Sequence, residues 1–189
     1  MKKQHILSIF NVSSQTKLIL QPLSKLRSYD NILPMNFSPI TTDLFIGTTP
    51  STEDYNQLRD LGVQLVINMR FSLSPRPDLH PKPIQTLWLR SLDNPFFPIS
   101  IHKLKQGAQA ALEVIHNGGK VYTHCAYGRH RGVAMGTCVL IAQGMNPQAA
   151  MELVAQCRSV ADPFAYYIRP RILKFANEWA REKVNADSK

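Results

Sequence analysis

The sequence predicts an α/β fold with a mainly parallel central sheet of four to five strands and helices on both faces. Short apolar, β-branched runs alternate along the chain with longer segments whose apolar residues recur at helical spacing. The chain has 189 residues, 44% of them hydrophobic, which suffices for one domain with a sizeable core but not for two. We therefore expect one domain at residues 39–184, preceded by an N-terminal extension at 1–38 and followed by a tail at 185–189.

The domain is predicted to open with a strand, a helix and a second strand. Residues 44–47 (LFIG) form a short apolar run that ends in glycine, which is typical of a strand before a turn. Residues 51–62 follow as a helix, because a serine or threonine can cap its first turn and a glycine ends it. The β-branched segment 63–69 (VQLVINM) predicts a strand buried between helical layers.

A proline-rich loop separates this strand from the next one. Four prolines lie within residues 70–83, and they remove backbone donors that a helix or a central strand needs. A third strand is expected at 84–89, then a loop at 93–98, a helix at 101–115 and a strand at 121–124.

Three helices are predicted to complete the domain. Residues 132–142 are almost all apolar or small, which indicates a helix buried on most sides. Pro147 begins a second helix that runs to about residue 158. The last helix is expected over residues 164–184, with an apolar stripe that we interpret as core packing. The stripe consists of Ile168, Ile172, Phe175 and Trp179.

Charge and cysteine content restrict the partners and the compartment. The net charge of +9 favours acidic partners such as phosphoproteins, anionic lipids or nucleic acids, although a merely solvated basic surface is an equal alternative. The apolar pieces within residues 1–23 are too short and interrupted to span a bilayer. Cys125, Cys138 and Cys157 form no CxxC pair, and their odd number argues against a disulfide framework. We therefore expect a cytoplasmic protein.

Residues 124–132 (HCAYGRHRG) carry the chemistry predicted for this chain. They lie between an apolar strand and a buried helix, and a loop at a helix N-terminus directs unpaired N–H groups toward a bound phosphate. The same field stabilises a thiolate, so Cys125 is the candidate nucleophile. Arg131, six positions later, can hold two phosphate oxygens with its planar guanidinium group.

The rest of this loop is expected to bind substrate. Gly128 permits the backbone conformation that turns N–H groups toward the ligand. Arg129 is either a substrate contact or a solvated charge, and His124 either supports the loop or fills the strand. The candidate substrate-binding residues are His124, Ala126, Tyr127, Gly128, Arg129, His130 and Gly132.

The pattern His-Cys-x5-Arg in this loop is similar to the signature of the protein tyrosine phosphatase superfamily. Residues 42–70 and the order of elements from about residue 40 to 180 resemble its dual-specificity branch. The resemblance implies hydrolysis of phosphomonoesters through a phosphocysteine intermediate, with no metal or organic cofactor. Asp93, in the loop upstream of Cys125, matches the general acid of that family, and Asp78 is the reserve candidate. Cys138 and Cys157 fall on apolar helix faces and are interpreted as structural.

Gly132 departs from the family pattern, which has serine or threonine after the arginine. The missing hydroxyl is expected to slow breakdown of the phosphoenzyme, so Gly132→Ser should raise turnover. A slow enzyme and a non-catalytic phosphate-binding module therefore stay open as alternatives. A rhodanese-like sulfurtransferase fits less well, because its cysteine loop lacks the upstream strand-helix-strand pattern.

The substrate class rests on modest signals. A dual-specificity protein phosphatase acting on phosphorylated Tyr, Ser or Thr is the first interpretation. Arg129 and His130 resemble the basic loops of lipid and inositol-phosphate phosphatases, and residues 167–170 (YIRP) look like a segment of mitochondrial phosphatidylglycerophosphate phosphatases. The expected partner is thus a phosphoprotein, an anionic phospholipid or an inositol phosphate. Peripheral contact with a membrane is compatible with this expectation, and no nucleic-acid partner is expected.

Overall fold

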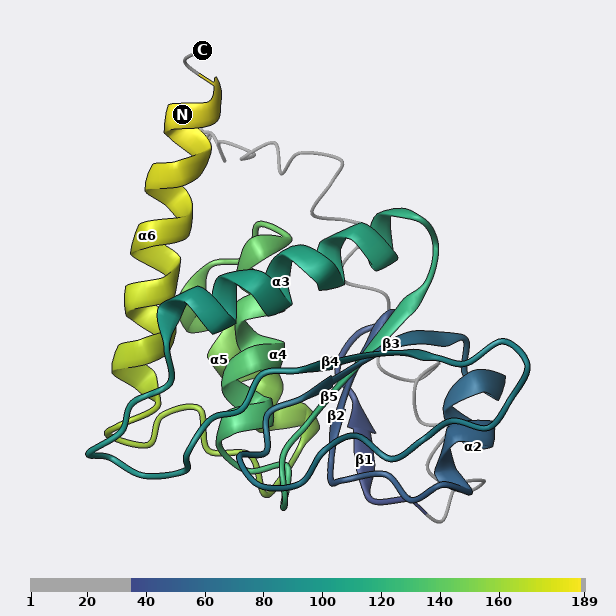
Figure 1. Cartoon of the computed structure of the whole chain (residues 1–189). Helices are drawn as coiled ribbons and strands as arrows, with labels where there is room; N and C mark the ends of the chain where they lie inside the picture. The colour runs from purple at the N-terminus through teal and green to yellow at the C-terminus, as the bar shows by residue number, and fades with distance from the viewer. Residues whose placement is uncertain (1–34, 188–189) are drawn as a thin grey trace, which may run out of the picture.

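The computed structural model describes residues 35–187, which form a five-stranded sheet with helices on both faces (Figure 1). The strands lie in the order β1-β2-β5-β3-β4, where β1 pairs antiparallel with β2 and the other neighbours are parallel. The predicted α/β class with a mainly parallel sheet is therefore confirmed. The strands are β1 (Phe37–Pro39), β2 (Leu44–Gly47), β3 (Val63–Asn68), β4 (Gln85–Trp88) and β5 (Lys120–His124). The helices are α2 (Asp54–Asp60), α3 (Ile101–His116), α4 (Arg131–Ala142), α5 (Pro147–Cys157) and α6 (Arg169–Asp187).

Most of the predicted N-terminal extension, residues 1–34, lies outside the described residues, as do residues 188–189 of the predicted tail. Phe37 and Ser38, which the prediction placed in the extension, belong to β1 and pair with β2. The division of the chain at residue 39 stays a prediction. Among the described residues, no helix is long and apolar enough to cross a membrane.

Alternation along the strands divides the interior into two cores. Successive strand residues point to opposite faces, so Leu44 and Ile46 join the core beneath α3 and α4, while Phe45 joins the core beneath α2. The same alternation separates Val121 from Tyr122 on β5. The two cores fix the sheet on both faces and so set the position of the loops at its carboxyl edge.

Helix α4 is the central helix of the larger core. All of its residues are buried, as predicted from their apolar and small side chains, and it contacts α3, α5, α6 and β5. It follows β5 after a loop of six residues. The N-terminus of α4 is therefore held at the carboxyl edge of the sheet, where the predicted phosphate-binding segment lies.

The last helix begins later than predicted. Helix α6 begins at Arg169, and residues 164–168 form turns. The reason is Pro170, which fits the first turn of a helix but would break a helix that began five residues earlier. Of the predicted stripe, Ile168, Ile172 and Phe175 are buried, and Trp179 packs against the core. The shift leaves Tyr167 in a loop rather than on a helix.

Candidate active site

The predicted phosphate-binding segment connects β5 to α4, and we call residues 124–131 the phosphate loop. Cys125 follows β5 directly, and Arg131 is the first residue of α4. Both side chains are nearly inaccessible, with exposed fractions of 1% for Cys125 and 8% for Arg131. Since the first N–H groups of a helix lack intrahelical partners, the start of α4 supplies donors to this loop.

A cleft of about 590 Å³ opens above the phosphate loop and brings Cys125 and Asp93 together. Of the predicted substrate-binding residues, Tyr127, Arg129 and His130 line this cleft, and the others lie along or behind the loop. The lining residues come from five separate segments of the chain. They are Asn36, Thr48, Asp93, Cys125, Tyr127, Arg129, His130, Val160 and Tyr167.

Gly128 has the backbone conformation that was expected of it. Its φ angle is 61°, in the left-handed region, and a Cβ atom there would lie 2.7 Å from the carbonyl oxygen of Gly47. Any other residue at this position would strain the loop and displace it from β2.

Arg158 holds the phosphate loop from behind. This buried side chain donates from Nε to the carbonyl oxygen of Gly128 (2.7 Å) and from Nη2 to that of Tyr127 (3.2 Å). The same guanidinium donates to Oδ1 of Asn36 (3.0 Å), so it ties the loop to the segment before β1. Burial lowers the pKa of Arg158. Sequence reasoning missed this residue, because an arginine at the end of an apolar helix carries no local signal for such a role.

Two threonines fix the ends of the phosphate loop. Thr49 donates its hydroxyl to the carbonyl oxygen of Cys125 (3.0 Å) and accepts a hydrogen bond from Nη1 of Arg70 (3.0 Å). Thr123 donates to the carbonyl oxygen of Gly132 (2.9 Å). The loop is thus held by side chains from three other segments.

His124 is buried beside the phosphate loop and stacks on Tyr122, with ring centroids 5.8 Å apart. Its Nδ1 lies 3.4 Å from the carbonyl oxygen of Cys125. Burial lowers the pKa of His124 to about 4, so the imidazole is neutral at pH 7. It supports the loop by packing and a hydrogen bond rather than by positive charge.

Asp93 is held over the phosphate loop by three side chains. The hydroxyl of Tyr167 donates to Oδ1 (2.8 Å), Nδ1 of His130 lies 3.4 Å away, and Nε of Arg131 lies 3.4 Å from Oδ2. The Tyr167 hydroxyl is also 2.9 Å from Nδ1 of His130. Burial and the neighbouring Asp93 carboxylate raise the pKa of Tyr167, so the phenol stays a donor. Sequence reasoning missed Tyr167, because it placed this residue on a helix.

Asp78, the reserve candidate for the acid, has a structural role instead. Its buried carboxylate pairs with Nη2 of Arg59 (2.7 Å) and accepts from the backbone N–H groups of Ile84 (2.8 Å) and His80 (3.1 Å). Although burial opposes ionisation, these hydrogen bonds hold the pKa of Asp78 below its ordinary value. Asp78 therefore stays ionised and does not line the cleft.

The expectation that Gly132→Ser raises turnover conflicts with the packing at this position. A Cβ atom on Gly132 would lie 2.8 Å from the carbonyl carbon of His124 and 3.0 Å from the backbone nitrogen of Cys125. Both atoms belong to the backbone of the phosphate loop, so a side chain would have to push the loop away from α4. Glycine here permits a close approach of helix and loop that serine would prevent.

The remaining predicted residues have simple surroundings. Arg129 is more than half exposed and lies 3.9 Å from Asp162, whose backbone N–H donates to the Arg129 carbonyl oxygen (2.9 Å). Cys138 is fully buried and Cys157 half-buried, and burial raises the pKa of both thiols. Within residues 35–187, no group of three His, Cys, Asp or Glu side chains is arranged to hold a metal ion.

Comparisons with known proteins agree on one fold. No protein-family model matches the chain. From Arabidopsis thaliana, the phosphatidylglycerophosphate phosphatase PTPMT1 is 31% identical over 147 residues, which cover 72% of this chain and 38% of that relative. The Arabidopsis thaliana dual specificity protein phosphatase 1 is 26% identical over 160 residues, which cover 84% of this chain and 77% of that relative. The chain thus spans less than half the length of the first relative.

The chain is also similar to a solved structure. The crystal structure of human DUSP28 superimposes with a TM-score of 0.67 at 22% identity, covering 77% of this chain and 96% of that one. At this identity the likeness shows a shared fold. The resemblance predicted from the His-Cys-x5-Arg signature is confirmed: the chain has the fold of the dual-specificity phosphatases and is similar in sequence to a dual specificity protein phosphatase and to a phosphatidylglycerophosphate phosphatase.

Proposed function

We propose that this protein is a cysteine-dependent phosphomonoester hydrolase that works through a phosphocysteine intermediate. One observation carries the proposal: Cys125, directly after β5, and Asp93, from the loop after β4, line the same cleft. A nucleophile in an anion-binding loop facing a carboxylic acid is the pair of groups that phosphate ester cleavage requires.

Phosphate is held by the start of α4 and by Arg131. Nη1 of Arg131 donates to the carbonyl oxygen of Ser91 (2.9 Å), which fixes the guanidinium plane. Nε of Arg131 is buried and lies 3.4 Å from Oδ2 of Asp93, but it makes no hydrogen bond within the described part of the chain. Because buried donors are rarely left unpaired, a phosphate oxygen is the acceptor to which this N–H group would donate.

The proposed reaction has two displacements at phosphorus. In the first, the Cys125 thiolate forms the S–P bond, the ester P–O bond breaks, and the proton of Asp93 passes to the leaving oxygen. In the second, Asp93 takes a proton from water, the water oxygen attacks phosphorus, and the S–P bond breaks to return the thiolate. Tyr167 holds the Asp93 carboxyl in place for both steps through its 2.8 Å hydrogen bond.

Two substrate classes fit this site. Phosphoproteins are the class suggested by the signature and by the relative named a dual specificity protein phosphatase. Phosphorylated lipids are the second class, favoured by the relative named a phosphatidylglycerophosphate phosphatase and by the exposed Arg129 in the cleft.

The test is phosphate release by the full chain in metal-free buffer with a reductant. The substrates are an aryl phosphate, phosphotyrosine and phosphothreonine peptides, phosphatidylglycerophosphate and an inositol phosphate. We expect turnover that Cys125→Ser abolishes and Cys157→Ser, a matched change at a half-buried helical cysteine, leaves intact. Phosphate binding without release from any of these substrates would refute the hydrolase and leave the binding module.

A further inference from the structure

Exposed apolar side chains gather around the mouth of the cleft. Among the described residues, five of the large hydrophobic side chains that remain exposed line the cleft or a second pocket, and Phe96 is the chain neighbour of one of them. We call these six the apolar rim: Phe71, Leu92, Phe96, Phe97, Tyr127 and Val160. Since β3, β4 and β5 are parallel, the loops after them lie at the same edge of the sheet, the lower edge in Figure 1.

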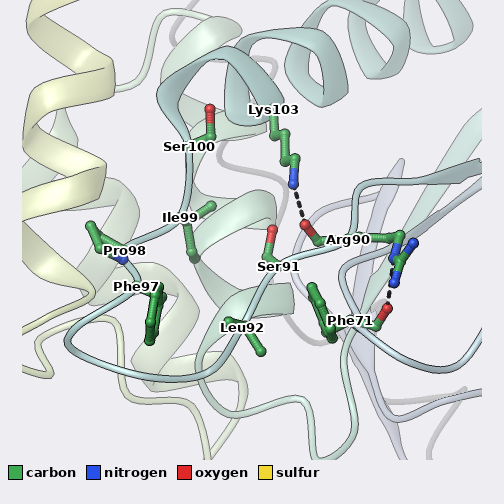
Figure 2. Close-up of a pocket in the computed structure, with 9 residues that line it drawn as sticks. All are labelled: Phe71, Arg90, Ser91, Leu92, Phe97, Pro98, Ile99, Ser100 and Lys103. Atoms are coloured by element: carbon green, nitrogen blue, oxygen red, sulfur yellow. Dashed lines mark hydrogen bonds between the residues drawn. The ribbon is translucent and has the colours of Figure 1, made fainter.

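The apolar rim forms two groups, one in the cleft that Asp93 lines and one in a second pocket. Tyr127 and Val160 line the catalytic cleft itself. Phe71, Leu92 and Phe97 surround a separate small pocket of about 170 Å³ beside the loop that follows β4 (Figure 2). Phe96, at the tip of that loop, has 86% of its surface exposed. Burying such side chains is favourable, so their joint exposure in the cleft and in the second pocket indicates a surface that is covered when the protein works.

Cations accompany the apolar rim on both sides. Arg90 and Lys103 line the pocket in Figure 2, and no carboxylate is among that pocket's lining residues. The Arg90 guanidinium lies 4.8 Å from the Phe71 ring centroid, so charge and aromatic surface are presented together. Arg129 adds a further exposed cation at the cleft. The chain as a whole has a net charge of +9, which favours a negatively charged partner.

We propose that this face docks onto an anionic lipid surface, with Phe96 and Phe97 entering the interface and Arg90, Lys103 and Arg129 facing the headgroups. Aromatic side chains on separate loops, flanked by cations and grouped around an opening, match the two requirements of interfacial binding, apolar insertion and attraction to anionic lipid. The proposal deepens the proposed function, on which it rests, by placing the cleft against phosphorylated headgroups.

The test is sedimentation of the full chain with vesicles of phosphatidylcholine alone or mixed with phosphatidylglycerol. We expect binding to the mixed vesicles that weakens with added salt. The double change Phe96→Ser with Phe97→Ser should lower the partition coefficient about tenfold or more, because the inserted apolar area is lost.

Leu79→Ser is the matched control, since Leu79 is 82% exposed but lies next to the start of β4, where Asp78 accepts from the Ile84 N–H group. It should bind vesicles like the unchanged protein. Hydrolysis of a soluble aryl phosphate, measured on every variant, should be equal in all of them and tests the hydrolase separately.

Three outcomes would overturn the docking proposal. The first is that the unchanged protein binds neither kind of vesicle. The second is that Leu79→Ser and the double variant lose vesicle binding equally. The third is that the double variant keeps vesicle binding and loses only phosphopeptide turnover. The last outcome would assign the rim to a protein partner.

Discussion

The two loops that frame the cleft are held in opposite ways. The phosphate loop is fixed by the buried Arg158 and the half-buried Thr49, which donate to its backbone carbonyl groups, and by the buried Thr123, which donates to the carbonyl oxygen of Gly132 just after the loop. The acid loop, residues 92–98, presents Phe96 and Phe97 to solvent and is tied to the site through the side chain of Asp93. Buried backbone contacts resist local opening, whereas exposed loops open easily. The cleft thus combines a firmly held half, the phosphate loop, with a half that is held in place by a few polar contacts at Asp93.

The largest effect is expected from removing the acid itself. Asp93→Asn keeps the size of the side chain but has no proton to give, so kcat should fall about 10²- to 10⁴-fold. The loss in kcat/KM, which reports the first displacement, should be greatest for aryl phosphates with poorly acidic leaving groups, which need the proton most. Values of kcat/KM across a series of leaving groups measure this, and a uniform loss in kcat/KM would contradict the role of Asp93 as the acid.

Removing Arg158, which supports the phosphate loop, should lower the stability of the protein. Arg158→Met leaves the carbonyl groups of Gly128 and Tyr127 without their donor, and the cost should be about 3 kcal/mol in the free energy of unfolding. Urea unfolding checks the value, with Arg181→Met on the exposed side of α6 as the control. Equal stability of both variants would mean that Arg158 does not hold the loop.

Weakening the support of Asp93 in the acid loop should affect catalysis and leave stability unchanged. Tyr167→Phe removes the 2.8 Å hydrogen bond to Asp93 and should lower kcat about tenfold for poorly acidic leaving groups, with KM and the unfolding midpoint nearly constant. Tyr166→Phe is the matched control, because Tyr166 is exposed and adjacent. If Tyr167→Phe lowers kcat equally for all leaving groups, Tyr167 acts on something other than proton transfer to the leaving group.

At neutral pH the smallest effect is expected from the titration of His124, which matters only as the pH falls. Burial lowers the pKa of His124 to about 4. As the pH falls below about 6.5, the imidazole is therefore protonated in the unfolded chain but stays neutral in the folded protein. The contribution of His124 to stability is therefore complete above pH 6.5 and declines by about 1.4 kcal/mol per pH unit as the pH falls toward 4. Unfolding free energies over this range should show a shallower slope in His124→Asn, and parallel slopes would refute the assignment.

The predictable part of this molecule was the part encoded locally. The strand at 121–124, the phosphate loop and the buried helix α4 are contiguous, so their order and composition specified the anion site. Arg158 and Tyr167 lie far along the chain from the groups they hold, and their contacts depend on how α5 and α6 pack. The late start of α6 was signalled by Pro170, and reading that signal would have placed Tyr167 in a loop. The close contact at Gly132 could not be predicted from the sequence, because it depends on how α4 packs against the backbone of the preceding loop.

The central claim is that Cys125 becomes phosphorylated during turnover. Rapid mixing with an aryl phosphate, acid quenching and intact-mass analysis tests it directly. We predict a species heavier by one phosphoryl group, which maps to Cys125, accumulates in Asp93→Asn and is absent from Cys125→Ser. Phosphate release by the unchanged protein with no such species, or turnover that survives Cys125→Ser, would contradict the mechanism.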